Sequence, residues 1–164
     1  MKTDRHLSRL SILVGRHLRE RGILIATAES CTGGWVAKAL TDVAGSSEWF
    51  AEGWITYSNE SKHLRLGVPL NVLKRHGAVS EATVAAMARG ALLRSGAGSA
   101  LSVSGIAGPG GAVAGKPVGT VWFAWAVRAG RGIRVWTQRK RFRGDRAAVR
   151  LSAAIHALEG VLKS

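Results

Sequence analysis

Two segments of the chain are apolar on both faces of an extended strand, and this feature restricts the fold more than any other. Residues 23–28 read ILIATA and residues 120–127 read TVWFAWAV, so apolar side chains point to either side. A strand of this type must be covered on both faces, as happens when helices pack against each side of a sheet. The sequence therefore predicts an α/β fold in which helices enclose the sheet.

Helical patterns alternate with these strands along most of the chain. Between residues 4 and 20, apolar side chains recur at helical spacing with arginines between them. The predicted caps of three later helices are Asn59, Ser80 and Asp145. We predict helices over residues 4–20, 33–41, 59–67, 79–97 and 145–162, and strands over residues 23–28, 53–58, 99–108, 120–127 and 132–143.

The last two predicted strands follow one another directly. The segment RAGRG joins them, which is typical of a hairpin. The strand at 120–127 should be central, and the strand at 132–143, which alternates and carries most of the local charge, should lie at an edge. Together the elements predict a mixed sheet in a three-layer α/β/α sandwich. Since no linker or repeat is evident, we expect a single domain over residues 1–164.

The composition favours a globular protein. Of its 164 residues, 46% are hydrophobic and 21% are charged, and no apolar run approaches the ~20 residues that a membrane span needs. The N-terminal segment mixes charged and apolar residues, which is unlike a signal peptide. Cys31 is the only cysteine, so an internal disulfide and a multi-cysteine zinc site are excluded. We expect a cytoplasmic protein.

The formal net charge is +14, from 24 basic and 10 acidic residues. Such an excess attracts polyanions, nucleotides and phosphorylated metabolites. One interpretation is a nucleic-acid contact through the basic segment RKRFR at residues 139–143. The six tryptophans argue against it, because they lie in apolar segments and are not interleaved with the basic residues. The five histidines show no metal-ligand spacing.

Small polar residues gather where three of the predicted strands end. Residues 27–34 read TAESCTGG, residues 57–62 read YSNESK and residues 104–111 read SGIAGPGG. In open α/β sheets, ligands bind outside the carboxyl ends of the strands. If these strands are parallel, the three clusters meet in one site, and this convergence is stronger support for function than any single motif.

The first two clusters contain groups suited to nucleophilic catalysis. Ser30 and Cys31 are candidate nucleophiles at the start of a predicted helix, where free N–H groups could hold a phosphate or an oxyanion. Lys62 could take the proton of a serine if burial keeps it neutral, and Tyr57 could relay it. The alternatives are an ordinary helix cap, a half-buried aromatic residue and a solvated lysine.

The third cluster opens a glycine-rich segment whose backbone could cradle a phosphate or enclose a ring. It matches neither the P-loop nor the dinucleotide-binding fingerprint, so nucleoside-triphosphate chemistry is not supported. A plain flexible loop is the alternative. At the start of the last helix, Arg146 or Arg150 could reach a phosphate, or both could be solvated.

Six motifs stand in one order along the chain: TAESCTGG, YSNESK, VSE, SGIAGPGG, KPVGTVW and GDRAAVR. Together they closely resemble the CinA C-terminal domain, the nicotinamide-mononucleotide deamidase family, over roughly residues 5–162. Members often carry a further N-terminal domain like a molybdopterin-binding domain, and this chain looks like the stand-alone form. Ser104 stands where the pattern usually has threonine, so the hydroxyl is kept.

The resemblance implies an α/β/α sandwich that hydrolyses the carboxamide of nicotinamide mononucleotide to nicotinate mononucleotide and ammonia, in pyridine-nucleotide recycling. It implies no metal and no cofactor. It also implies that Ser30 is the nucleophile and that Tyr57 and Lys62 assist proton transfer. The residues expected to bind the substrate are Glu29, Cys31, Thr32, Gly33, Gly34, Ser104, Gly105, Gly108, Gly111 and Arg146.

Two other functions stay open at this point. One is a nucleic-acid-associated or ligand-sensing module linked to competence or DNA damage, whose nucleic-acid binding should fall steeply with salt. The other is an amidase that acts on a different carboxamide. An enzyme is favoured over a pure binding module, because such a module has no need of Ser30, Tyr57 and Lys62 together. A homo-oligomer, dimeric or larger, is expected.

Overall fold

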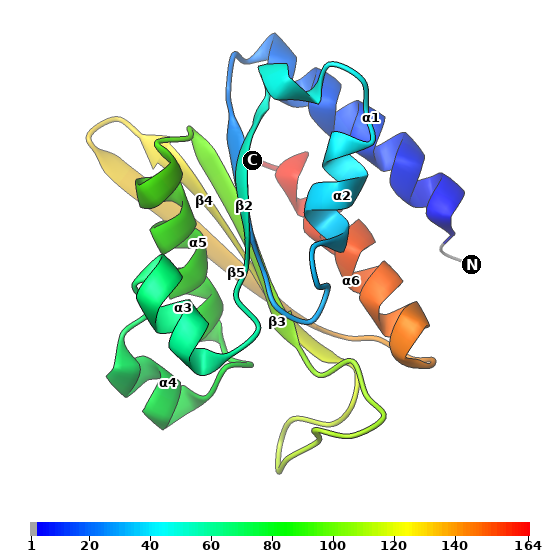
Figure 1. Cartoon of the computed structure of the whole chain (residues 1–164), viewed down its shortest axis with the longest axis vertical. Coiled ribbons are helices and arrows are strands. Elements are labelled where there is room, and N and C mark those ends of the chain that lie inside the picture. Colours follow the sequence, from blue (N-terminus) through cyan, green and yellow to red (C-terminus); the bar gives the residue numbers. More distant parts are fainter. Residues whose placement is uncertain (1–2) are drawn as a thin grey trace.

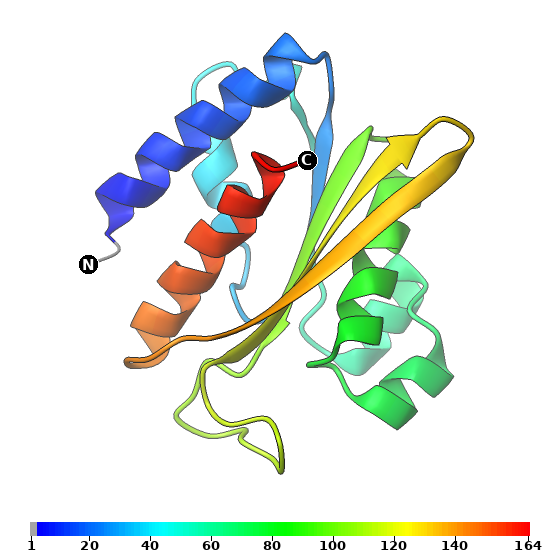
Figure 2. The ribbon, with the colours of Figure 1, turned by 180° about the vertical axis from the view of Figure 1, so that it is seen from behind.

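A five-stranded sheet separates two layers of helices (Figures 1 and 2). In this computed structural model, which describes residues 3–164, the strands lie in the order β2 (Phe50–Ile55), β1 (Ile25–Glu29), β3 (Ser99–Gly105), β4 (Thr120–Ala129) and β5 (Gly132–Arg141). β1 pairs in parallel with β2 and β3, whereas β4 pairs antiparallel with β3 and β5. The mixed sheet of a three-layer α/β/α sandwich is therefore confirmed.

The helices divide between the two faces of the sheet (Figure 1). One face carries α1 (Asp4–Glu20), α2 (Trp35–Thr41) and α6 (Arg146–Val161), and the other carries α3 (Asn59–Leu66), α4 (Leu70–His76) and α5 (Glu81–Ser95). A short 3₁₀ turn, η1 (Ser46–Glu48), precedes β2. In the described part of the chain, no helix is long and apolar enough to cross a membrane.

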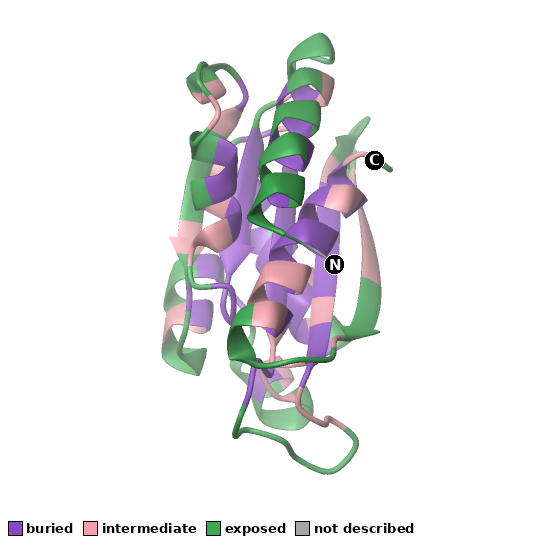
Figure 3. Cartoon of the chain, turned by 90° about the vertical axis from the view of Figure 1, so that its right-hand side faces the viewer, coloured by how far each residue is buried: buried purple, intermediate pink, exposed green. Residues whose placement is uncertain are grey.

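The two cores on either side of the sheet differ in side-chain size. Large side chains such as Trp49, Phe123 and Trp125 fill the core beneath α1, α2 and α6, whereas β1, β3 and β4 present mostly alanines to α5. Small side chains let α5 lie close to the sheet. The central strands β1, β3 and β4 and the inner helix faces are buried, while the edge strands β2 and β5 and the outer helix faces are largely exposed (Figure 3).

One glycine is required where α3 and α5 meet. A Cβ added at Gly90 of α5 would lie 1.9 Å from the carbonyl oxygen of Leu66, the last residue of α3. No side chain fits at that distance, so Gly90 permits the close approach that seats α3 on α5. This contact matters for function because α3 carries Lys62.

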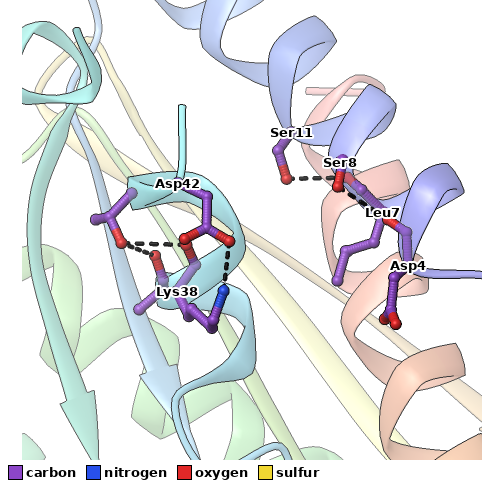
Figure 4. Close-up of polar contacts among 8 residues, drawn as sticks. Asp4, Leu7, Ser8, Ser11, Lys38 and Asp42 are labelled. Atoms are coloured by element: carbon purple, nitrogen blue, oxygen red, sulfur yellow. Dashed lines mark hydrogen bonds and ion pairs between the residues drawn. The ribbon is translucent and has the colours of Figure 1, made fainter. Parts of the chain in front are cut away.

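Polar groups of α1 and α2 are satisfied within their own helices (Figure 4). On α1, the hydroxyl of Ser8 donates to the carbonyl of Asp4 at 2.9 Å, and the buried hydroxyl of Ser11 donates to the carbonyl of Leu7 at 3.0 Å. On α2, Lys38 pairs with Asp42 one turn later on an exposed face. Ser11 can therefore face the core without leaving an unpaired polar group.

Most of the predicted elements are confirmed. α1, α5 and α6 match the predicted helices, with Ser80 and Asp145 as the caps. The predicted strands after residues 23, 99, 120 and 132 are β1, β3, β4 and β5, and the predicted helix at 33–41 begins later, at Trp35. β4 lies inside the sheet and β5 at its edge, as expected.

Two local predictions were wrong. The second strand spans Phe50–Ile55 rather than 53–58, because the carbonyls of the next two residues bind the side chain of Lys62. The cap of α3 is Ser58 rather than Asn59, since the Ser58 hydroxyl accepts from the amide of Ser61. Pro69 immediately precedes α4, a position where its missing N–H costs nothing.

Large apolar side chains remain exposed on both helical layers. They are Ile12 and Leu13 on α1, and Leu64, Leu70 and Leu93 on α3, α4 and α5. Such positions are where copies of the chain could meet. The homo-oligomer stays a prediction.

Candidate active site

The three polar clusters meet at one edge of the sheet. Because β1, β2 and β3 are parallel, their carboxyl ends lie together, and the long loop between β3 and β4 extends beyond them (Figure 1). A cavity of about 240 Å³ opens there. Its lining includes Ser30, Cys31, Tyr57, Ser104, Gly105, Gly108, Gly111 and Arg146, with the backbone around Ala78 and Val79 of the turn before α5. The convergence predicted from the sequence is confirmed.

Ser30 and Lys62 form the central pair of this site. Ser30 follows β1 directly, and its amide is fixed by the carbonyl of Val103 on β3. Lys62, from α3, places its Nζ 3.0 Å from the Ser30 Oγ. Ser30 therefore lies at the end of a sheet strand, and Lys62 comes from the helical layer on the α5 side.

Lys62 is completely buried, with 0% of its surface exposed. Its Nζ also contacts the carbonyl oxygens of Thr56 at 2.6 Å and Tyr57 at 3.4 Å. Burial disfavours the charged amine and lowers the pKa of Lys62 from its ordinary 10.5 to about 8. The solvated lysine considered from the sequence is thus ruled out, and the buried amine is suited to accept a proton.

Tyr57 lies at the mouth of the cavity rather than beside the Ser30 hydroxyl. Its side chain is 61% exposed, so it is not the half-buried aromatic residue considered from the sequence. Its hydroxyl accepts a hydrogen bond from Arg146 at 3.0 Å. The second arm of the Arg146 guanidinium donates to the carbonyl of Gly108 at 2.8 Å. Tyr57, Arg146 and the glycine-rich loop are thereby linked across the opening.

Glu29, the last residue of β1, binds the loop that follows it. Its buried carboxylate accepts hydrogen bonds from the Thr32 hydroxyl at 2.6 Å and from the amides of Gly34, Val36 and Ala37 at 2.8–3.1 Å. Burial raises the pKa of the Glu29 carboxyl, and these four hydrogen bonds oppose that rise. The N–H groups of α2 that the sequence suggested for an anion are therefore already used by Glu29.

The loop from Ser30 to Gly33 is a tight turn. The amide of Gly33 donates to the carbonyl of Ser30 at 3.0 Å, and both Gly33 and Gly34 have positive φ angles, of 62° and 92°. Within residues 3–164, the amide of Thr32 has no acceptor, and the amide of Cys31 contacts only its own thiol. These two N–H groups directly follow the nucleophile, which is where an oxyanion hole is needed.

Cys31 is unsuited to be the nucleophile. Burial raises the pKa of its thiol to about 12, and the neighbouring Glu29 acts in the same direction. A thiol reacts as the thiolate, which is scarce at neutral pH under these conditions. Of the two nucleophiles considered from the sequence, only Ser30 has a base beside it.

Ser104 lies beside Ser30 at the end of the neighbouring strand. It is almost fully buried and lines the cavity. The loop that follows bends at Gly108 and Gly111, whose φ angles of 86° and 91° are disfavoured for residues with a side chain. Lys116, later in the same loop, donates to the carbonyl of His76 at 2.7 Å and so ties the loop to the end of α4.

A family model described as the CinA C-terminal domain matches residues 7–164. The chain belongs to the CinA C-terminal domain family. A relative from Escherichia coli strain K12, named "Nicotinamide-nucleotide amidohydrolase PncC", is 55% identical over 157 residues, which cover 96% of this chain and 93% of the relative. A protein of the same name from Pseudomonas putida is 50% identical over 157 residues, 96% of each chain.

The fold of this CinA chain is also that of solved structures. A crystal structure of a CinA superfamily protein from Klebsiella pneumoniae 700603 superposes with a TM-score of 0.91 at 42% sequence identity, covering 96% of each chain. This CinA chain therefore has the fold of the solved CinA superfamily proteins.

The structure also shows what the sequence reasoning missed in this CinA chain. Arg150 of α6 does not line the cavity but binds the carbonyls of Cys31 and Thr32 at 3.0 Å each. Lys116 received no role from the sequence, although the KPVGTVW motif contains it. Within residues 3–164, no three His, Cys, Asp or Glu side chains gather to hold a metal ion.

Proposed function

We propose that this chain hydrolyses the carboxamide of nicotinamide mononucleotide, releasing nicotinate mononucleotide and ammonia. The observation that carries the proposal is the buried Lys62 amine, 3.0 Å from the Ser30 hydroxyl at the edge of the cavity. The names of the relatives that are 50–55% identical support the substrate. A buried lysine beside a serine supports acyl transfer as the reaction.

The first step is attack by Ser30 on the carboxamide carbon. A neutral amine has two N–H groups and one lone pair, so Lys62 can donate to the carbonyls of Thr56 and Tyr57 while it accepts the Ser30 proton. The C–O bond forms, the carbonyl electrons move onto oxygen, and the amides of Cys31 and Thr32 stabilise the resulting oxyanion.

The second step expels ammonia. The oxyanion collapses, the C–N bond breaks, and Lys62 returns its proton to the leaving nitrogen. Water then attacks the acyl-enzyme, with Lys62 taking one of its protons, and the ester bond to Ser30 breaks. The acid is released and Ser30 recovers its proton, so the cycle consumes one water and no cofactor.

The opening of the cavity suits the 5′-phosphate of the nucleotide. The Arg146 guanidinium is exposed there and is held between Gly108 and Tyr57. A planar guanidinium can bind a phosphate through two parallel hydrogen bonds. Because Lys62 is the only residue among 3–164 that forms a hydrogen bond with the Ser30 hydroxyl, we assign proton transfer to Lys62, and we assign Tyr57 to holding Arg146 at the mouth.

The test is ammonia release from nicotinamide mononucleotide by the purified protein, with the acid product identified by chromatography and mass spectrometry. Ser30→Ala should abolish turnover while thermal unfolding stays that of the parent. Ser8→Ala is the matched control, because Ser8 is an exposed serine on α1 far along the chain from the site. Ammonia release by Ser30→Ala at the parent's rate would overturn the serine mechanism.

An inactive parent with an intact fold would direct the assay to other carboxamides and then to nucleic acid. The surface suited to nucleic acid is formed by exposed basic residues of β5, namely Arg139, Lys140 and Arg141. Binding of duplex DNA that weakens steeply as salt rises is the sign of such a contact.

A further inference from the structure

One side chain braces the backbone next to the nucleophile. Arg150 of α6 donates through Nε to the carbonyl of Cys31 and through a terminal nitrogen to the carbonyl of Thr32, both at 3.0 Å. These are two successive peptide units, separated from Arg150 by more than a hundred residues of chain. The planar fork of a guanidinium can bind both at once, which the single amine of a lysine cannot do in the same geometry.

The bond to Cys31 fixes the direction of the following amide. In a trans peptide the C=O and the N–H point in opposite directions. The carbonyl of Cys31 points to Arg150, so the N–H of Thr32, in the same peptide unit, points away from α6. Lys62 reaches Ser30 from the helical layer on the other side of the sheet. The Thr32 amide is thus turned from α6 towards the side where the chemistry takes place.

That amide is a buried donor without an acceptor. Thr32 is 0% exposed, yet within residues 3–164 its amide donates to no group of the chain. Buried N–H groups in native structures nearly always have a partner. The missing acceptor is supplied when the oxygen of a bound acyl group sits beside Ser30.

Arg150 is itself held firmly in place. Its guanidinium lies over the ring of Trp35, 5.4 Å from the centroid, at the start of α2. Gly33 leaves room for it, because a Cβ there would come within 3.2 Å of a terminal nitrogen of Arg150. Arg150 is therefore held by contacts with α2 and with the loop as well as by its own helix, α6.

From these contacts we propose that Arg150 is a positioning residue: through the carbonyl of Cys31 it orients the Thr32 amide that stabilises the oxyanion formed on Ser30, and through the carbonyl of Thr32 it fixes the rest of the loop. This inference rests on the proposed acyl-transfer function and extends it to a residue outside the cavity. Arg150 acts on the transition state and not on substrate binding, because it touches only the far side of the loop.

The test compares Arg150→Met, which keeps the length of the stem without the donors, and Arg150→Lys with the parent. For nicotinamide mononucleotide, kcat should fall about 10- to 100-fold in Arg150→Met, less in Arg150→Lys, while KM stays within about threefold. Arg134→Met is the matched control, since Arg134 also lies over a tryptophan ring but binds no loop carbonyl. It should keep the parent's kcat.

A second readout separates orientation of the amides from general loosening of the fold. The aldehyde analogue of nicotinamide mononucleotide forms a hemiacetal with a serine, and its oxygen occupies the oxyanion position. Its inhibition constant should rise in Arg150→Met by about the factor that kcat falls, whereas inhibition by the product nicotinate mononucleotide should not change. Unchanged aldehyde inhibition in a folded Arg150→Met would overturn the inference.

Acetylation of Ser30 by p-nitrophenyl acetate makes the test independent of the natural substrate. If the parent is acetylated but does not hydrolyse nicotinamide mononucleotide, the proposed substrate fails while the Arg150 inference is still decided by the rate of acetylation. Acetylation of Arg150→Met within about threefold of the parent overturns the inference. If Arg150→Met does not fold, Arg150→Lys is judged by the same kcat, KM and acetylation measurements.

Discussion

The ionisation of Lys62 should control the pH dependence of the reaction. Lys62 must be neutral before it can accept the proton of Ser30, and burial lowers the pKa of Lys62 from 10.5 to about 8. With a pKa of about 8, about 10% of the enzyme holds the neutral amine at pH 7 and about 90% at pH 9. We therefore expect kcat/KM to rise about tenfold over this range and then to level off.

Two assays together measure this profile. Ammonia release from nicotinamide mononucleotide is followed at constant ionic strength between about pH 6 and 9.5. Acetylation of Ser30 by p-nitrophenyl acetate is followed in parallel, because this ester does not ionise and its profile reports the enzyme alone. A midpoint near the pKa of Lys62 in both assays is the expected result. A rate that is flat or falls between about pH 6 and 9 would contradict Lys62 as the base.

The same change in pKa must appear in the stability of the fold. Between about pH 8 and 10.5 the unfolded chain keeps the Lys62 proton while the folded chain has released it, so the free energy of unfolding rises with pH. The difference of about 2.5 pH units corresponds to about 3 kcal/mol at about 1.4 kcal/mol per unit. In Lys62→Met this contribution is absent.

Urea unfolding of the parent and of Lys62→Met at several pH values isolates the contribution of Lys62 to the free energy of unfolding. The stability of the parent minus that of the variant should increase by about 2.5 kcal/mol between about pH 7 and pH 10, since other groups cancel in the difference. A difference that stays constant with pH would show that Lys62 titrates alike in the folded and unfolded chains, and the low pKa would be wrong.

Two further substitutions test how the loop and the helical layer are held. Glu29→Gln should lower the free energy of unfolding by about 2–4 kcal/mol and reduce kcat, because an amide cannot accept all four hydrogen bonds that the carboxylate receives. Urea unfolding measures this change beside that of the exposed Glu48→Gln, which should be less than about 1 kcal/mol, and equal effects would contradict the role given to Glu29. Gly90→Ala should destabilise the protein by about 3 kcal/mol, because the new Cβ would lie 1.9 Å from the Leu66 carbonyl oxygen. In the control Gly132→Ala the nearest atom is 3.7 Å from the new Cβ, so its urea midpoint should stay close to that of the parent, and a parent-like midpoint for Gly90→Ala would refute the close contact.

The fold could be predicted because its main determinants are local. A strand that is apolar on both faces, such as 120–127, specifies its own burial, and the parallel order of β1, β2 and β3 then brings Ser30, Lys62 and Ser104 to one edge. The short helix α4 was missed because only Leu73 of it is buried, so it carries almost no apolar pattern.

The finer parts of the site depend on contacts that the spacing of residues along the sequence does not reveal. Glu29 looked like a substrate-binding residue of the TAESCTGG motif, but it ends β1 on the face towards α2 and therefore caps that helix. The direction of Tyr57 depends on Arg146, and the conformation of the nucleophile loop depends on Arg150. Both arginines come from α6, and the packing of α6 on α1, α2 and the sheet decides what they reach.

The position of α6 at the end of the chain has a consequence for biosynthesis. The ribosome makes Ser30 and Lys62 early, and domains begin to fold from the N-terminal side during synthesis. A nascent chain made as far as β3 already contains Ser30, Lys62 and the Val103 carbonyl that holds the Ser30 amide, yet Arg146 and Arg150 are still to be translated. Under the proposed mechanism, a chain that has not yet reached α6 therefore holds Ser30 and Lys62 but lacks the two arginines that bind the opening of the cavity and the loop after Ser30.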